Sequence, residues 1–123
     1  MKQQQFESLS VPELVEKFAA IGTEQDKALE VDDTAKYNPL FWQMQAVVKE
    51  LKSRRGDQRR ALLALYDHPK MQVRLAAAKA TLRVAPGAAR QLIEAIAATT
   101  WYPQAGDAGM CLWALDKGIF KPE

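Results

Sequence analysis

Apolar residues recur at three- and four-residue spacing through most of the chain, a period typical of amphipathic helices. The first apolar stripe runs from Leu14 to about Val31. It follows Ser10-Val11-Pro12-Glu13, in which the serine stands at the N-cap and the glutamate at the third helical position, as in a capping box. We therefore predict a first helix that begins after Ser10. Gly22 interrupts the stripe; it costs about 1 kcal/mol relative to alanine in a helix, and it also indicates close packing of a second helix.

A second stripe extends over 37–51. Pro39 leaves two starting points open, because the helix either begins at Thr34 and kinks at the proline or is capped by Asn38 with the proline as its first residue. The stripe begins before Asn38, so we favour the earlier start. Gly56 predicts the stop that follows this helix.

Four shorter helices follow. Asp57 caps the first of them, which ends at the Asp-His-Pro turn of residues 67–69, and the others are predicted over about 70–84, 88–99 and 107–117. Residues 101–106 form the clearest predicted loop. The last helix carries four apolar side chains: Met110, Leu112, Trp113 and Leu115. No segment shows the alternation of a strand, so the fold class is all-α, with about six helices in stacked antiparallel hairpins.

Residues 58–84 resemble a HEAT repeat, with an aspartate and a proline in the turn and a Val-Arg pair and adjacent alanines on the second helix. These positions are Asp67, Pro69, Val73, Arg74, Ala77, Ala78 and Leu82. Small residues allow two helices to approach closely, and we expect Arg74 to have a structural role by bonding Asp67 or a helix end.

Three other segments, 33–38, 56–63 and 106–116, together with this repeat resemble a small bacterial family, domain of unknown function 2019. The similarity spans almost the whole chain. The family is helical and HEAT-like and has no assigned activity. The resemblance therefore implies a HEAT/armadillo-like α-α superhelix and leaves the function open.

The length of 123 residues suits one domain, 1–123, in which we expect residues 1–9 to be loosely ordered. One cysteine, Cys111, excludes an internal disulfide, and with one histidine, His68, the ligands are too few for a zinc site. No apolar run approaches the roughly 18 residues of a membrane span, and the first residues are polar. We expect a cytoplasmic protein with no membrane contact, metal or cofactor.

No catalytic residues are predicted, because no serine or cysteine has a matching base in its sequence context. His68 is interpreted as a turn residue and Cys111 as a buried thiol. We therefore expect that the protein is not an enzyme.

Charge is unevenly distributed along the chain. Residues 51–90 hold ten Lys/Arg and two Asp/Glu, between acidic segments on either side. Arg54, Arg55, Arg59 and Arg60 straddle Gly56, and we predict that they gather near one corner and bind an acidic partner or a nucleic-acid backbone. The alternative is solvation together with pairing to four acidic residues of the first helix: Glu13, Glu16, Glu24 and Glu30.

Trp101 and Tyr102 are the second pair of candidate partner-binding residues. Either they fold back and cap the open end of the helical stack, or they form a protein-contact patch, because Trp, Tyr and Arg dominate interface hot spots. Trp113, in the middle of the last helix, is predicted to be core.

The function expected from these features is a protein-interaction module with an unidentified protein partner, one version being an immunity-type protein that binds a toxin. The alternative is binding to a nucleic-acid backbone through residues 51–90, where Lys79 and Arg83 lie one helical turn apart. A homodimer is also considered, because the first two helices are long and hydrophobic.

Overall fold

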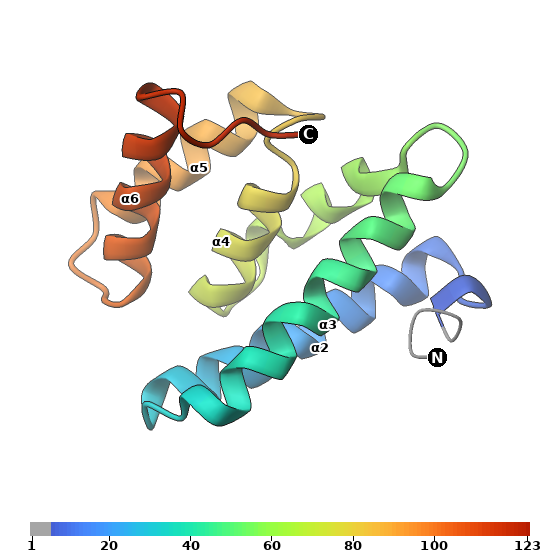
Figure 1. The fold of residues 1–123 in the computed structure, drawn as a ribbon, viewed down its shortest axis with the longest axis horizontal. Helices are drawn as coiled ribbons and strands as arrows, with labels where there is room; N and C mark the ends of the chain where they lie inside the picture. The colour runs from blue at the N-terminus through green and yellow to red at the C-terminus, as the bar shows by residue number, and fades with distance from the viewer. Residues whose placement is uncertain (1–5) are drawn as a thin grey trace.

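The computed structural model describes residues 6–123, and within them every regular element is helical. The elements in chain order are α2 (Val11–Glu30), α3 (Thr34–Ser53), the 3₁₀ helix η1 (Gln58–Asp67), α4 (Met71–Ala80), α5 (Pro86–Ala97) and α6 (Gln104–Asp116). Figure 1 shows α2 and α3 side by side as a hairpin, α4 in the middle, and α5 and α6 paired at the far side. The predicted all-α fold is confirmed.

The two long helices begin where the sequence predicts. The Ser10 hydroxyl accepts the Glu13 N–H at 3.2 Å, and the Glu13 carboxylate accepts the Ser10 N–H at 2.8 Å, which completes the capping box of α2. α3 begins at Thr34 and contains Pro39 inside the helix, so the earlier of the two starts is confirmed.

The shorter helices differ from expectation in their ends. α4 stops at Ala80 rather than near 84, because the Thr81 hydroxyl donates to the Ala77 carbonyl at 2.8 Å and the next residues form turns. α6 begins at Gln104, inside the segment predicted to be loop, because Gln104 and Ala105 are buried against the rest of the molecule. The helix capped by Asp57 has 3₁₀ geometry.

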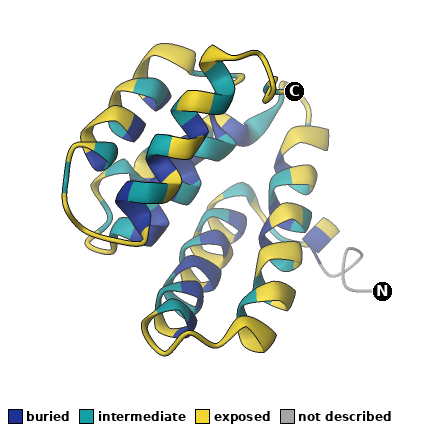
Figure 2. Ribbon diagram, turned by 60° about the vertical axis from the view of Figure 1, so that its left-hand side comes forward, coloured by how far each residue is buried: buried dark blue, intermediate teal, exposed yellow. Residues whose placement is uncertain are grey.

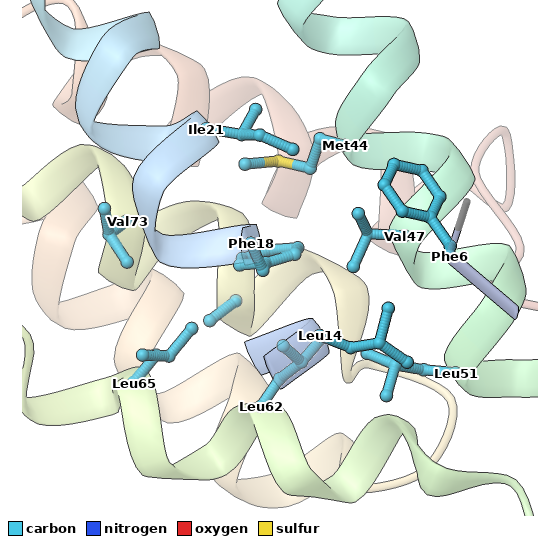
Figure 3. Packing of buried hydrophobic residues seen from close by; sticks show 11 residues of the cluster. Phe6, Leu14, Phe18, Ile21, Met44, Val47, Leu51, Leu62, Leu65 and Val73 are labelled. Atoms are coloured by element: carbon cyan, nitrogen blue, oxygen red, sulfur yellow. The ribbon is translucent and has the colours of Figure 1, made fainter. Parts of the chain in front are cut away.

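The buried residues form two clusters. The N-terminal cluster joins α2, α3, η1 and α4 around large side chains, and Figure 3 shows them pointing toward one another. Its members are Phe6, Leu14, Phe18, Ile21, Met44, Val47, Leu51, Leu62, Leu65, Val73 and Ala77. Phe6 is only 6% exposed, and Leu9 packs against the same cluster. Residues 1–5 of the segment expected to be loosely ordered lie outside the described residues.

The C-terminal cluster joins α4, α5 and α6 and is rich in small side chains. Its members are Leu75, Ala78, Leu82, Ala89, Ile93, Ile96, Ala108 and Cys111. Close packing also holds α4 against α2, where a Cβ placed on Gly22 would lie 2.8 Å from Val73 Cγ2. Gly22 therefore lies where two helices approach closely, as the sequence indicated for this residue.

The prediction that Trp113 belongs to the core is wrong, because this residue is 50% exposed. Met110, on the same helix, is 64% exposed. The face of α6 that packs inward consists instead of Gln104, Ala105, Ala108 and Cys111. Leu112 and Leu115 are partly buried against the C-terminal cluster, whereas Met110 and Trp113 are turned outward. Figure 2 shows the resulting pattern of buried inner and exposed outer faces.

Candidate functional site

A groove of about 580 Å³ separates α3 from α4 and α6. Its floor includes Phe18 and Gln25 of α2. One wall is α3, which contributes Tyr37, Phe41, Met44, Gln45 and Val48. The opposite wall is formed by α4, α6 and the C-terminal tail, which contribute Gln72, Leu75, Ala76, Lys79, Ala80, Asp107, Met110, Cys111, Ala114, Phe120, Pro122 and Glu123, and Arg59 and Arg83 complete the lining.

Both walls of the groove present apolar side chains to solvent. Phe41 on α3 is 38% exposed, and Met110 on α6 faces the same groove. Phe120 of the tail adds a third, and its backbone N–H is held by the Ala114 carbonyl at 3.1 Å. The groove therefore has the composition of a binding surface, because exposed apolar side chains gathered in a concavity gain free energy when a ligand covers them.

A chain of buried amides crosses the molecule beneath one end of the groove. Gln104 Nε2 donates to Gln72 Oε1 at 3.0 Å, and Gln72 Nε2 donates to Gln25 Oε1 at 3.1 Å. This glutamine ladder connects α6, α4 and α2, with each side chain at most 5% exposed. Tyr37 lies at the same end, where burial, with a smaller contribution from the Asp107 carboxylate, raises the pKa of its phenol.

The charged residues of the groove are mostly paired. Lys79 Nζ lies 3.0 Å from the Asp107 carboxylate. Arg59 is 6% exposed and bonds Asp57 through two nitrogens, at 2.9 and 2.6 Å, and this hydrogen bonding lowers the pKa of the Asp57 carboxyl. Arg83 lines the groove and forms no ion pair within residues 6–123. Arg83 is therefore the cation in the lining that has no carboxylate paired with it in the described part of the chain.

The four arginines predicted to gather at one corner have different surroundings. Arg54 bonds Glu50 at 2.6 Å and donates to the carbonyls of Phe6 and Leu9, so it fastens the N-terminal segment to α3. Arg59 donates to the Asp57 carboxylate, as described above. Arg55 is exposed, and exposed Arg60 donates to the Val84 carbonyl.

None of the four arginines forms an ion pair with α2 within the described residues. The internal carboxylates come instead from neighbouring positions in the chain, Glu50 and Asp57. Arg55 and Arg60 are the pair that the structure leaves on the surface, and the partner-binding role of the corner stays a prediction.

Trp101 and Tyr102 are both exposed, by 66% and 69%. They lie in a short connection before the cis proline Pro103, at the edge of a second hollow of about 640 Å³. This hollow is also lined by Asp26 and Lys70, whose charged groups are 4.0 Å apart. The two rings are accessible, as a contact patch requires, and their role in binding stays a prediction.

The residues assigned structural or turn roles surround the connection between η1 and α4. Arg74 donates to the His68 carbonyl at 2.6 Å, so its acceptor is a helix end and not the Asp67 carboxylate. His68 Nδ1 accepts the Lys70 N–H at 3.0 Å, as a turn residue does. Cys111 is buried as predicted, and burial raises the pKa of its thiol. No helix of residues 6–123 is long and apolar enough to cross a membrane.

The groove was not anticipated from the sequence, although α6 carried a signal of it. Its apolar positions occupy both the inward face, with Ala108 and Cys111, and the outward face, with Met110 and Trp113. A helix that is apolar on both faces of a small domain has more apolar surface than that domain buries. Of these two outward side chains, Met110 lines the groove.

Comparison with known proteins gives a family and a close structural relative. A solved structure, described as the crystal structure of the protein RPA1889 from Rhodopseudomonas palustris CGA009, is 52% identical. The similarity covers 95% of this chain and 97% of the other, with a TM-score of 0.92. No curated protein matches. Residues 12–116 match a family described as a domain of unknown function, DUF2019, and the chain belongs to that family.

Proposed function

We propose that the protein is a non-enzymatic interaction module of HEAT-like type that binds an amphipathic helix of a partner protein in the groove between α3, α4 and α6. The observation that carries this proposal is the pair of apolar walls, with Phe41 exposed on one side and Met110 on the other. Helices bound in grooves of this kind insert residues at three- and four-residue spacing between such walls.

A helix suits these walls better than an extended strand. A bound strand gains much of its affinity from backbone hydrogen bonds to a sheet edge. Apart from the C-terminal tail, the groove is bordered by helices, whose backbone N–H and C=O groups are already bonded within each helix. A helical ligand needs no backbone partner, so side-chain contacts with the groove are sufficient.

The length of the groove matches about three helical turns. Its α3 wall extends from Tyr37 to Val48, which corresponds to about 16 Å at the rise of an α-helix. A ligand helix therefore presents three or four apolar side chains to the groove.

Comparative affinity capture tests the proposal. The tagged wild type, a groove variant with Phe41→Glu and Met110→Glu, and a control variant, Val31→Glu, are used with lysate of the native host. Val31 is 73% exposed and lies outside the groove, so the control introduces a charge at an apolar surface position without touching the walls. We expect a partner that binds the wild type and the control and is lost from the groove variant.

Equal recovery of every captured protein by the groove variant would contradict the proposal, provided that circular dichroism shows the variant folded. The immunity-type version has a further test. The captured partner should be toxic when it is expressed alone, and co-expression of the wild type, but not of the groove variant, should relieve the toxicity.

A further inference from the structure

We propose that the C-terminal tail, residues 118–123, is a strap that closes over part of the groove and competes with the partner helix. This inference rests on the proposed function and adds its regulation. Three features of the tail carry it: the turn at Gly118, the apolar side chains that the tail places in the groove, and a pair of opposite charges in the lining.

The direction of the tail is set by the end of α6. Gly118 has a φ of +72°, a conformation that favours glycine, and its N–H donates to the Leu115 carbonyl at 3.1 Å. The N–H groups of Ile119 and Phe120 both donate to the Ala114 carbonyl, at 2.9 and 3.1 Å. The bonds of Gly118 and Ile119 are those of a Schellman motif, which ends a helix at a left-handed glycine. The path of the tail is therefore fixed where it leaves α6.

From this turn the tail follows the groove. Figure 1 shows it running from the end of α6 toward the connection between α4 and α5. Phe120 and Pro122 belong to the groove lining, whereas Ile119 and Lys121 do not. Phe120 is 37% exposed and Ile119 is 67% exposed, so the apolar side chain in the lining is the better covered of the two. The tail thus already places two side chains where a ligand would place its own.

Opposite charges complement this apolar contact. Arg83, which follows α4, and Glu123 of the tail line the same groove, and neither forms an ion pair within residues 6–123. Arginine bonds a carboxylate through two parallel N–H groups. Pairing of Glu123 with Arg83 closes the strap and holds Phe120 and Pro122 over the groove. Exposed ion pairs are weak, so the closure is reversible and a partner can displace it.

A strap and a fixed wall have opposite effects on binding. If a ligand binds only the open form, the observed affinity is the intrinsic affinity multiplied by the open fraction. Weakening the strap therefore raises the affinity. A fixed wall contributes apolar contacts to the ligand, so loss of its side chains lowers the affinity. The sign of the change distinguishes the two.

Titration with Nile red, an uncharged dye that fluoresces in apolar surroundings, measures access to the groove without the natural partner. The whole 123-residue chain is used as wild type and as Gly118→Ala, Phe120→Ser and Glu123→Gln. Alanine strains the turn at Gly118 because of its positive φ, yet no atom lies within 4 Å of the added Cβ. Gly118→Ala therefore loosens the tail without altering a side chain of the groove lining.

Each variant has a matched control outside the groove lining. Gly87→Ala adds a Cβ in open space at a glycine without a positive φ, and Ile119→Ser and Lys121→Gln change the tail at its two residues that face away from the groove. Circular dichroism confirms that every variant is folded.

We expect Gly118→Ala and Phe120→Ser to raise the affinity for Nile red at least about threefold, and Glu123→Gln about twofold, while the controls leave it unchanged. Arg83→Gln should match Glu123→Gln, and the double variant should add nothing further because both changes remove the same ion pair. Added salt screens that pair, so it should raise the affinity of the wild type more than that of Glu123→Gln.

The contrary results are distinct. Lower affinity in Phe120→Ser, with Gly118→Ala unchanged, would make the tail a fixed wall and overturn the inference. Dye binding that persists in Phe41→Glu/Met110→Glu would also overturn it, because a strap over the groove controls only a ligand that enters the groove. Neither result touches the proposed function, which fails separately if this groove variant captures the same proteins from lysate as the wild type.

Discussion

The two buried clusters of this protein are built from different side chains. The N-terminal cluster contains phenylalanine, methionine and several leucines, drawn from four helices and from Phe6. The C-terminal cluster contains alanines and one cysteine beside a few leucines and isoleucines. Large interlocking side chains bury much apolar area for each residue, whereas small ones allow helix axes to approach closely.

The difference concerns how the two parts of the molecule use their large apolar side chains. The N-terminal cluster uses its large apolar side chains internally and concentrates the free energy of folding there. In the C-terminal part, α6 packs through small residues and the partly buried Leu112 and Leu115, while Met110 and Trp113 face outward. Met110 forms part of one apolar wall of the groove.

The largest effect is expected from truncation in the N-terminal cluster. Phe18 is completely buried, and Phe18→Ala should lower the free energy of unfolding by about 3–5 kcal/mol because it removes a large apolar side chain and leaves a cavity. Urea denaturation followed by circular dichroism measures this loss. Phe41→Ala, at a partly exposed position of α3, is the control and should lose much less. Similar losses of unfolding free energy in the two variants would contradict the distinction between the core position and the groove position.

Replacement of a buried polar side chain that links the clusters should have the next largest effect on stability. Gln72→Leu removes the middle of the glutamine ladder and leaves Gln25 and Gln104 without their partners, at a cost of about 1–3 kcal/mol for each buried polar group. Replacement of all three glutamines by leucine should restore much of this loss, because no unpaired amide then remains. A triple variant that is less stable than Gln72→Leu would show that the ladder itself stabilises the packing.

Enlargement of a buried side chain should destabilise the C-terminal cluster. Ala108 is completely buried in α6, and Ala108→Leu should cost about 1–3 kcal/mol because the added carbons displace α4 or α5. Gly109→Ala, one residue away and facing open space, is the matched control and should stabilise the helix by up to about 1 kcal/mol. Thermal unfolding of the two variants should therefore shift in opposite directions.

The smallest effect concerns the exposed start of α2. The hydrogen bond from the Ser10 N–H lowers the folded-state pKa of Glu13 below its ordinary value of 4.5. Because the folded-state pKa is the lower one, Glu13 contributes stability above pH 4.5 and loses it as the pH falls through the folded-state pKa. The difference in melting temperature between wild type and Glu13→Gln should therefore shrink on acidification, and a difference independent of pH would assign the effect to helix propensity.

The sequence predicted most where the signals were local. The capping box at Ser10 and Glu13 and the stripe that favoured Thr34 as the start of α3 depend on residues within one or two helical turns, and both predictions are confirmed. The Arg74 bond to a helix end and the burial of Cys111 followed from the same kind of local pattern.

Predictions that depended on distant neighbours were less successful. The boundary of α6 was placed too late, because the burial of Gln104 depends on Gln72, a residue in another helix. Trp113 was assigned to the core from its position in the middle of the helix, although its exposure is decided by which face of α6 meets α4 and α5. The sequence also did not reveal that Arg54, besides its bond to nearby Glu50, donates to carbonyls more than 40 positions earlier in the chain.

The sequence by itself determined that this chain is helical, where its long helices begin, and which family it resembles. Apolar period, caps and helix-breaking residues act over a few residues, so they can be recognised without coordinates. Only the tertiary structure decided that the walls of α3 and α6 face one groove and that Arg83 is part of its lining. Such arrangements depend on helix approach distances, which are set by side-chain volumes summed over several helices and not by any local pattern.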